Sequence, residues 1–491
     1  MTEFRSGDVG HAFQRIARDY QNFPAFVSPH SHVTYAELMS ISVSFAHRMR
    51  ELGVNRKSVV AINTGDTIAS VAMLLATSFL GCQFVVASMV IARQKVVRPT
   101  HFFKTPDAAG KKNVSFVTID ASWMPQGPCD LSTALDDFEG FENEDDLWMF
   151  LHTSGTTGNP KMLGLSHGAV FRRTMAVSDD FPTAQTTMAS LFGNTSRPFY
   201  ARALGCLLHA GTIVDSYDVS FWKAAGVNVV FGSPRQLERF FAESPVPSKI
   251  ARVEVSGAKL TDELAIKLSV MFDQVLDVYG ASETSKTFSN IIECTSDGAV
   301  RRRGKPLDSV IEILDDAGAI CPPGVPGSVR VRNDYMTSGY LAAPQATAKS
   351  FRGGWFHPGD VAQWGLSSEL EIIGRNDDVL SIGGLKLDAA LIDLIITVTP
   401  GVKDAICFNN PKEGAKNEIL AFVVFEDLTN KAYCVSNIRE GYQTKLNLPC
   451  FLGNIHAVDA VPRNDEGKPM RALCQQMVLD RVDELQSVFV P

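Results

Sequence analysis

Helical and strand patterns alternate through the first two thirds of this chain of 491 residues, and this alternation limits the folds open to it. Residues 35–52 and 234–241 carry apolar side chains at helical spacing, whereas 58–62 and 227–231 are short apolar runs typical of buried strands. Further segments of the same two kinds are a helix at 221–225 and strands at 253–255 and 274–278. Helices that alternate with buried strands predict an α/β fold with mostly parallel sheets.

The pattern changes twice after this α/β region. Residues 310–332 alternate with period two and contain Pro-Pro-Gly and Pro-Gly turns, which predicts a small antiparallel subdomain. A polar segment then leads into VLSIGGLKLD, a two-strand pattern, followed by an apolar strand at 419–425 and a helix at 470–486. We therefore predict a large multi-sheet α/β domain over 1–376 and a small α+β domain over 377–491.

One stretch of the α/β region resembles a membrane span. Residues 67–92 contain no charged side chain, and this length is enough to cross a bilayer. Ser, Thr and Gln are interspersed, however, and Gly81 interrupts the run. We predict a buried helix of about fourteen residues, a stop at Gly81 and a strand near 83–90; a transmembrane helix is the alternative.

Composition and charge limit which classes of protein and which partners are expected. The formal net charge is −8 and there is no long basic tract, which argues against nucleic acid as the main partner. The nine cysteines include no C-x-x-C pair, which suits reduced thiols in the cytosol. The N-terminal stretch MTEFRSGDVG has no apolar run and is not a signal peptide. We expect a cytoplasmic protein of undetermined oligomeric state.

The segment LHTSGTTGNPK, at 151–161, is unlike any core-forming segment. It holds four hydroxyl side chains, two glycines and a lysine. Glycines allow close backbone approach, and successive backbone N–H groups can form a nest that holds an anion. It is not a Walker A loop, because its lysine follows Pro160 and precedes Met162 instead of a Ser or Thr. The composition predicts a phosphate-binding loop, with a solvated Ser/Thr/Gly linker as the alternative.

Four further segments accompany this loop, namely VYGASET at 278–284, GWFHPGD at 354–360, EIIGRNDD at 371–378 and PRNDEGKPMR at 462–471. In order and spacing, the five segments resemble the acyl-adenylate-forming superfamily of acyl-CoA synthetases, peptide-synthetase adenylation domains and beetle luciferases. The resemblance extends from Tyr35 to Arg471. It implies that the small C-terminal domain is hinged, and that a carboxylic acid reacts with ATP to give an acyl-AMP before a thiol displaces AMP.

The resemblance also implies a nucleotide site. Tyr279 stacks on adenine, Asp360 accepts hydrogen bonds from the ribose hydroxyls, and Arg375 supports the ribose or a phosphate. Core packing for Tyr279 and a turn role for Asp360 are the alternatives. The loop residues implied to hold the β- and γ-phosphates are Thr153, Ser154, Gly155, Thr156, Thr157, Gly158 and Lys161. The remaining nucleotide-binding residues are Gly257, Ala258, Lys259, Asp277, Gly280 and Ala281.

Catalytic roles follow from the same resemblance. Glu283 holds Mg²⁺ between phosphates, because a hard cation prefers carboxylate oxygen; a surface carboxylate is the alternative. Ser282 lies near the α-phosphate, and Lys468 bridges the attacking carboxylate and that phosphate. Asp377 matches the hinge position. Rotation about Asp377 moves Lys468 out of the active site and brings the Gly383-Gly384 loop in. The two glycines leave room for a thiol tunnel; a tight turn is the alternative.

The acid pocket is the least specified part of the site. The candidate residues combine apolar and small side chains, which suits an aryl or aliphatic acid; they are Phe192, Asn194, Phe231, Gly232, Ser233, Ser256 and Ala281. Amino-acid-activating relatives place an aspartate near Phe192, whereas this chain has no acid until Asp215. That difference disfavours an α-amino acid substrate.

Coenzyme A is the expected thiol acceptor, and the phosphopantetheine thiol of an acyl carrier protein is the alternative. A nucleotide-binding protein without catalytic activity is a more distant alternative. The basic run Arg301–Arg303 with Lys305 either contacts a CoA phosphate or, as we expect, forms a solvated loop. Pro358 before Gly-Asp and Ser381 in place of a common lysine depart from the family pattern. Neither removes a group essential to adenylation, and we expect such departures to bear on the thiol step and on the geometry of the acid pocket.

Overall fold

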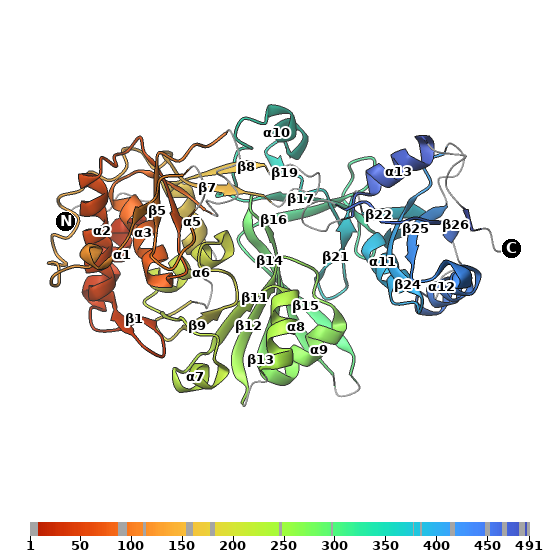
Figure 1. Cartoon of the computed structure of the whole chain (residues 1–491), viewed down its shortest axis with the longest axis horizontal. Helices are drawn as coiled ribbons and strands as arrows, with labels where there is room; N and C mark the ends of the chain where they lie inside the picture. Colours follow the sequence, from red (N-terminus) through yellow and green to blue (C-terminus); the bar gives the residue numbers. More distant parts are fainter. Residues whose placement is uncertain are drawn as a thin grey trace.

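The computed structural model describes residues 8–86, 96–110, 114–153, 161–176, 182–244, 248–295, 298–376, 378–382, 385–412, 418–446, 452–463, 469–480 and 487–488. Within these residues the strands form five sheets. In Figure 1 the N-terminal segments, in red, lie at one end of the molecule and the C-terminal segments, in blue, lie at the other. The green middle of the chain lies between them.

The largest sheet has nine strands. Their order is β15 (Val300–Pro306), β14 (Ser285–Cys294), β13 (Phe272–Ala281), β12 (Ile250–Ser256), β11 (Val229–Gly232), β9 (Thr187–Ser190), β10 (Thr212–Val214), β1 (Pro24–Val27) and β2 (His32–Thr34). From β13 to β1 all neighbours pair in parallel, and the pairings that involve β14, β15 and β2 at the edges are antiparallel. This sheet confirms the expected α/β class.

The second large sheet has six strands. Their order is β6 (Val117–Thr118), β5 (His101–Lys104), β3 (Val59–Asn63), β4 (Gln83–Val85), β7 (Leu147–His152) and β8 (Met162–Ser166). The pairs are parallel except for β7 with β8, which form an antiparallel hairpin. The hairpin places the loop predicted to bind phosphate at its connection. Of the strand expected near 83–90, β4 accounts for three residues, and 87–95 lie outside the described residues.

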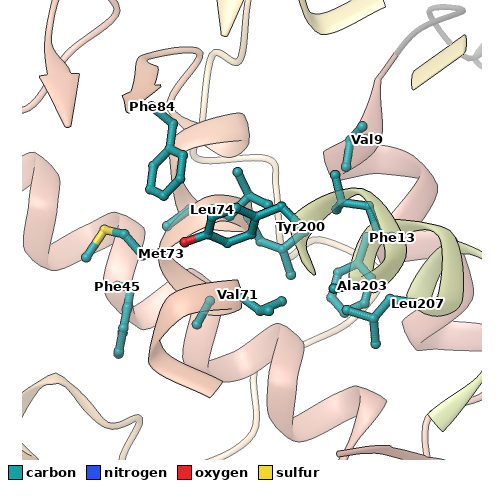
Figure 2. Close-up of a cluster of buried hydrophobic side chains, with 14 of the residues drawn as sticks. Val9, Phe13, Phe45, Val71, Met73, Leu74, Phe84, Tyr200, Ala203 and Leu207 are labelled. Atoms are coloured by element: carbon teal, nitrogen blue, oxygen red, sulfur yellow. The ribbon is translucent and has the colours of Figure 1, made fainter. Parts of the chain in front are cut away.

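Helices fill the space against both large sheets. Residues of α1 (Val9–Asp19), α2 (Tyr35–Glu51), α3 (Thr67–Phe79) and α6 (Arg197–Leu208) share one hydrophobic core with strands of both. Figure 2 shows Phe13, Leu74, Phe84 and Tyr200 converging in this core. The other helices of this part are η1 (Ala121–Trp123), α5 (His167–Ala176), α7 (Val219–Ala224), α8 (Pro234–Glu243) and α9 (Asp262–Met271).

Burial explains why residues 67–86, the described part of the uncharged stretch, carry no charge. Every residue of α3 except Ile68 is buried, and the Asp66 side chain caps the helix by accepting from the backbone N–H of Ala69. The Tyr200 and Ser70 hydroxyls lie 2.6 Å apart and satisfy each other inside the core. Among the described residues, no helix has the length and apolar character needed to cross a membrane.

The predicted antiparallel subdomain is confirmed as a third sheet. It joins β18 (Phe351–Arg352), β19 (Trp355–Phe356), β17 (Gly327–Arg332), β20 (Asp360–Trp364) and β21 (Leu370–Arg375), and β16 (Val310–Leu314) pairs with β17. Helix α10 (Pro344–Ser350) precedes β18. Within this sheet Asp360 lies opposite Arg375. Two residues from separate motifs therefore meet side by side.

The C-terminal part has its own sheets and core. A hairpin joins β22 (Val379–Ile382) to β23 (Leu385–Asp388), as the VLSIGGLKLD pattern predicts. A second sheet orders β24 (Val402–Asn409), β25 (Ile419–Phe425), β26 (Leu452–Ala457) and β27 (Ser487–Val488). Its helices are α11 (Ala389–Thr397), η2 (Leu428–Asn430), α12 (Lys431–Leu446) and α13 (Arg471–Asp480). Of the helix expected over 470–486, residues 481–486 lie outside the described residues.

Two local expectations differ from the structure. The Arg301–Arg303 run, expected as a solvated loop, forms part of strand β15, where Arg302 and Arg303 pair with Asp262 and Glu293 at 2.6 and 3.2 Å. The strand expected at 274–278 continues to Ala281, because β14 pairs with its end. A Cβ on Gly280 would lie 2.2 Å from the Ser285 carbonyl oxygen, so only glycine fits there.

Candidate active site

One cavity of about 2120 Å³ brings the separate motif segments together. Its lining comes from the β7–β8 hairpin, the ends of β12 and β13, the third sheet and the C-terminal part. The predicted nucleotide-binding and catalytic residues in its lining are Thr153, Lys161, Gly257, Ala258, Lys259, Asp277, Tyr279, Gly280, Ala281, Ser282, Glu283, Asp360 and Arg375. Among these predicted residues, Thr153 and Arg375 are 222 positions apart in the sequence, yet both line the same cavity.

Several predicted residues lie outside the described residues. They are Ser154, Gly155, Thr156, Thr157, Gly158, Asp377, Gly383, Gly384 and Lys468. The chain on both sides of two of these segments lines the cavity, through Thr153 and Lys161 and through Asn376 and Asp378. Next to Lys468, Pro469 lines it as well. The backbone N–H of Thr153 donates to the carbonyl of Lys161 at 2.9 Å and closes the base of the loop between them.

At the end of the cavity where phosphate binding is predicted, which we call the phosphate end, Tyr340 links Lys161 to Glu283. The ammonium nitrogen of Lys161 lies 4.7 Å from the centre of the Tyr340 ring, a cation–π distance. The Tyr340 hydroxyl donates to Glu283 Oε1 at 2.7 Å. Burial and the Glu283 carboxylate raise the pKa of Tyr340. The sequence does not single out Tyr340, since a tyrosine before α10 has no local signal of a site.

A buried arginine fixes the turn that carries Ser282 and Glu283. The Arg173 guanidinium donates to the carbonyls of Tyr335, Ser282 and Glu283 at 2.8, 2.9 and 2.6 Å. Burial lowers its pKa to about 9, so it remains protonated at neutral pH. The sequence gives no sign of this role for Arg173, because it lies in an ordinary helix, α5. Its three bonds hold the backbone so that the Glu283 side chain, 7 % exposed, faces the cavity.

The predicted ribose and adenine residues contact each other. Tyr279 donates its hydroxyl to Asp360 Oδ2 at 2.6 Å, and Arg375 donates to Oδ1 at 2.8 Å. Burial, and secondarily the Asp360 charge, raise the pKa of Tyr279 well above its usual value. Each carboxylate oxygen keeps a further lone pair for a ligand hydroxyl. The pair therefore fixes both the ring of Tyr279 and the acceptor geometry of Asp360.

Asp277 and Lys259 occupy the strand ends beside this group. Burial raises the pKa of Asp277 to about 6, although Arg302 and Lys259 partly offset it. The Lys259 ammonium lies 3.8 Å from Asp388 of β23, so it links the strand ends to the C-terminal hairpin.

The C-terminal motif is anchored by its last residue. The Arg471 side chain, 5 % exposed, pairs with Asp393 at 2.7 Å and Asp378 at 3.0 Å. It also donates to the Cys407 carbonyl at 2.7 Å. Burial alone would lower the pKa of Arg471, but these carboxylates raise it. Arg471 therefore ties the segment that follows Lys468 to the residue that follows Asp377.

The predicted acid-pocket residues divide into two groups. Phe192, Phe231 and Ser256, together with Ala281, line the cavity. The other three, although described, are absent from its lining and have other contacts: the Asn194 amide donates to the Gly65 carbonyl at 2.8 Å, Ser233 caps α8 with Gln236, and a Cβ on Gly232 would lie 2.9 Å from Leu237.

Cations, which the sequence does not predict here, also line this region. Arg202 of α6 lies between two aromatic rings, with its guanidinium carbon 4.9 Å from the Phe192 centroid and 5.0 Å from the Phe231 centroid. Lys286 of β14 lies 5.9 Å from the Phe231 centroid and pairs with the buried Glu254. The pocket predicted to combine only apolar and small side chains thus contains two half-buried positive charges.

Known proteins are similar to this chain over most of its length. The model of the family described as AMP-binding enzyme matches residues 13–341. A 3-hydroxybenzoate–CoA ligase from Aromatoleum sp. (strain CIB) is 25% identical over 92% of this chain and 93% of its own length. A linear gramicidin synthase from Brevibacillus parabrevis is 22% identical over 93% of this chain and 9% of its own length.

A solved structure has the same fold. The O-succinylbenzoate coenzyme A synthetase from Bacillus subtilis, in complex with AMP, superposes with a TM-score of 0.74 at 18% identity and covers 94% of this chain and 97% of its own. The family match spans more than half of the sequence and includes the segments that line the cavity as far as Tyr340. The chain therefore belongs to the AMP-binding enzyme family.

Proposed function

We propose that this enzyme is an AMP-forming acid–thiol ligase that joins a carboxylic acid to coenzyme A through an acyl-adenylate. The observation that carries the proposal is the set of contacts linking Lys161, Tyr340 and Glu283 in the same cavity as Tyr279 and Asp360. A cation and a carboxylate at one end suit phosphates with a metal ion, and an aromatic ring beside a carboxylate suits a nucleoside.

In the first half-reaction a carboxylate oxygen of the acid bonds to the α-phosphorus of ATP, and the bond to pyrophosphate breaks. Lys161 and the loop 153–161 neutralise the β- and γ-phosphates as charge moves onto the leaving group. Glu283 offers an oxygen ligand for Mg²⁺, which when bound would screen the phosphate charges. Ser282 donates near the α-phosphate, while Asp360, Arg375 and the Tyr279 ring hold the nucleoside.

The second half-reaction forms a bond between the thiol sulfur and the acyl carbon, and AMP leaves as the thiol proton is released. We assign Lys468 to the first half, Gly383 and Gly384 to the thiol path, and Asp377 to the hinge between domains 1–376 and 377–491. Support comes from the neighbours of these residues, since Asn376, Asp378 and Pro469 line the cavity.

The acceptor is tested by supplying both thiols. Purified protein is given ATP, Mg²⁺ and a panel of aryl and aliphatic acids, and pyrophosphate and AMP are measured. CoA or a phosphopantetheinylated carrier protein is then added and thioester is detected by mass spectrometry. Thioester with CoA supports the proposal, whereas thioester with the carrier alone favours the alternative that the match to the gramicidin synthase suggests. ATP binding without pyrophosphate release from any acid would contradict both.

The assignment of Lys468 and Asp377 predicts opposite defects. Lys468→Ala should abolish acyl-AMP formation yet still convert synthetic acyl-AMP and thiol into thioester. Asp377→Pro should retain adenylation and lose thioester formation, because a fixed φ hampers rotation at the hinge. Single-turnover measurements of each half-reaction check this. Equal loss of both halves in both variants, with folding intact, would indicate that one static arrangement performs both steps.

A further inference from the structure

The acid end of the cavity has more positive than negative side chains. We define the acid end by the five residues that line it, which are Phe192, Arg202, Phe231, Ser256 and Lys286. Two of the five are cations. An isolated charge is costly to bury, so buried cations are paired with anions or wait for an anionic ligand.

Within the described part of the chain, Glu254 supplies a carboxylate to this group. Glu254, 1 % exposed, pairs with Lys286 and with Arg252, the latter at 2.8 Å. Burial alone would raise the pKa of Glu254, but Lys286, Arg252 and Arg202 lower it to about 2, so this carboxylate is always charged near neutral pH. Among the described residues, Glu254 is thus the shared partner of Lys286 and Arg252, and its charge also acts on Arg202.

Among the described residues, the hydrogen-bond partners of the Arg202 side chain are neutral. It donates to the carbonyl of Pro198 at 3.0 Å and to the hydroxyl of Ser256 at 2.9 Å. Its Nε is buried and has no hydrogen-bond partner in the described part of the chain. Burial lowers the pKa of Arg202 to about 10, which still leaves it protonated at neutral pH. Each terminal nitrogen of the guanidinium makes one of these two bonds and carries a second N–H, so this side chain in the cavity lining can offer a planar fork of donors to an anion.

The two cations come from different elements and meet at one ring. Arg202 belongs to α6 and Lys286 to β14, and both lie over Phe231 of β11. The phosphate end, by contrast, contains Lys161 and Tyr340. Lys161 directly precedes β8 of the second sheet, and Tyr340 lies shortly before α10, which leads into the third sheet. The acid-end cations are therefore carried by other elements than the residues proposed to face the phosphates.

On the basis of the proposed function, we infer that the substrate is a carboxylic acid with a second anionic group, such as a dicarboxylic acid, which Arg202 and Lys286 bind while the first carboxylate is adenylated. The Phe192 and Phe231 rings favour an apolar body between the two acidic groups. Such a ligand would supply the negative charge that the acid end lacks. A monocarboxylic acid of the same size would leave both cations without it.

The test compares acids matched in size. Rates of CoA thioester formation are measured for benzoate against benzene-1,4-dicarboxylate, and for hexanoate against hexanedioate. A charge-assisted hydrogen bond in a buried site supports a preference on the order of 10- to 100-fold in kcat/KM for the diacid. In Lys286→Met and Arg202→Met the ratio of diacid to monoacid should fall at least about tenfold. Lys267→Met, an exposed cation on α9 paired with Glu238, should leave the ratio unchanged.

Loss of Lys286 alone leaves the Glu254 carboxylate with one cationic partner fewer. The double variant Lys286→Met with Glu254→Gln removes one charge of each sign and so keeps the net charge of the wild type. It should show the same fall in the ratio of diacid to monoacid. Wild-type protein that makes thioester from the monoacids at least as fast as from the diacids would overturn the inference and leave the proposed function intact. A wild-type preference for diacids that survives both single variants would also overturn it. Absence of thioester from every acid would instead count against the proposed function.

Discussion

The nucleotide end and the acid end of the cavity differ in how their charges are matched. At the nucleotide end Glu283 accepts from Tyr340, and Asp360 accepts from Tyr279 and Arg375. At the acid end one carboxylate, Glu254, serves Lys286 and Arg252, while Arg202 is bonded to neutral oxygens. One end is arranged by the protein in advance, and the other needs an anion from the substrate.

This difference has a physical meaning for specificity. Groups that already have partners within the protein are held in position before the ligand arrives, which lowers the entropy cost of binding. Groups that lack a partner discriminate strongly, because a wrong ligand leaves them desolvated and unpaired. We therefore expect nucleotide-end variants to affect all acids alike and acid-end variants to change the choice of acid.

The largest effect is expected from Lys161→Ala and Glu283→Gln. Each removes a group proposed to stabilise the charge that develops on the phosphates, and pyrophosphate release should fall on the order of 10²-fold or more. The fall should be the same for every acid that the wild type accepts. Thermal melts establish folding, and Lys249→Ala, an exposed lysine near Asp273, serves as the control. Wild-type rates in folded variants would contradict the assignment of the phosphate end.

Tyr279→Ala should have the next largest effect. Loss of a stack with adenine is expected to cost about 1–3 kcal/mol, as base–aromatic stacking does elsewhere, which is roughly a 5- to 150-fold rise in the KM for ATP. Tyr279→Phe keeps the ring and removes only the bond to Asp360, so it should be milder. Steady-state kinetics with ATP and acid varied separately check this. A change confined to the KM of the acid would place Tyr279 at the acid end instead.

The smallest effect concerns Asp277 and pH. Its folded pKa is raised to about 6, so between its usual pKa of 3.8 and pH 6 the folded state binds more protons than the unfolded state. The ionised carboxyl therefore costs stability, and this cost grows as pH rises through that window and is complete above pH 6. Asp277→Asn should raise the Tm at about pH 8 and have little effect near about pH 4.

The same variant tests whether Asp277 contacts the nucleotide. If the ionised carboxylate accepts a hydrogen bond from ATP, the wild-type KM for ATP should rise a few-fold as pH falls from about 7.5 to about 5.5. Asp277→Asn should bind ATP more weakly and show little of this pH dependence. Identical pH profiles in the two proteins would exclude Asp277 from the nucleotide end.

The sequence predicted the elements better than the site. Helix 35–52 became α2, ending at Glu51, and the strand predicted at 419–425 has the same bounds as β25. Apolar periodicity and capping residues act within a few positions of one another, so such elements are readable locally. The extension of β13 to Ala281 was missed because it depends on pairing with β14, which no local pattern encodes.

By itself, then, the sequence determined the α/β alternation and the antiparallel insertion, since each depends on short-range periodicity or turn chemistry, and it marked the motif segments through their resemblance to a known family. Tertiary structure alone decided which charges meet. Tyr340 lies 57 residues from Glu283, which it contacts. Arg202 and Lys286 come together only because α6 and β14 both pack near the Phe231 ring. In the sequence both cations are indistinguishable from solvated surface charges, because burial and pairing arise only when distant elements pack together.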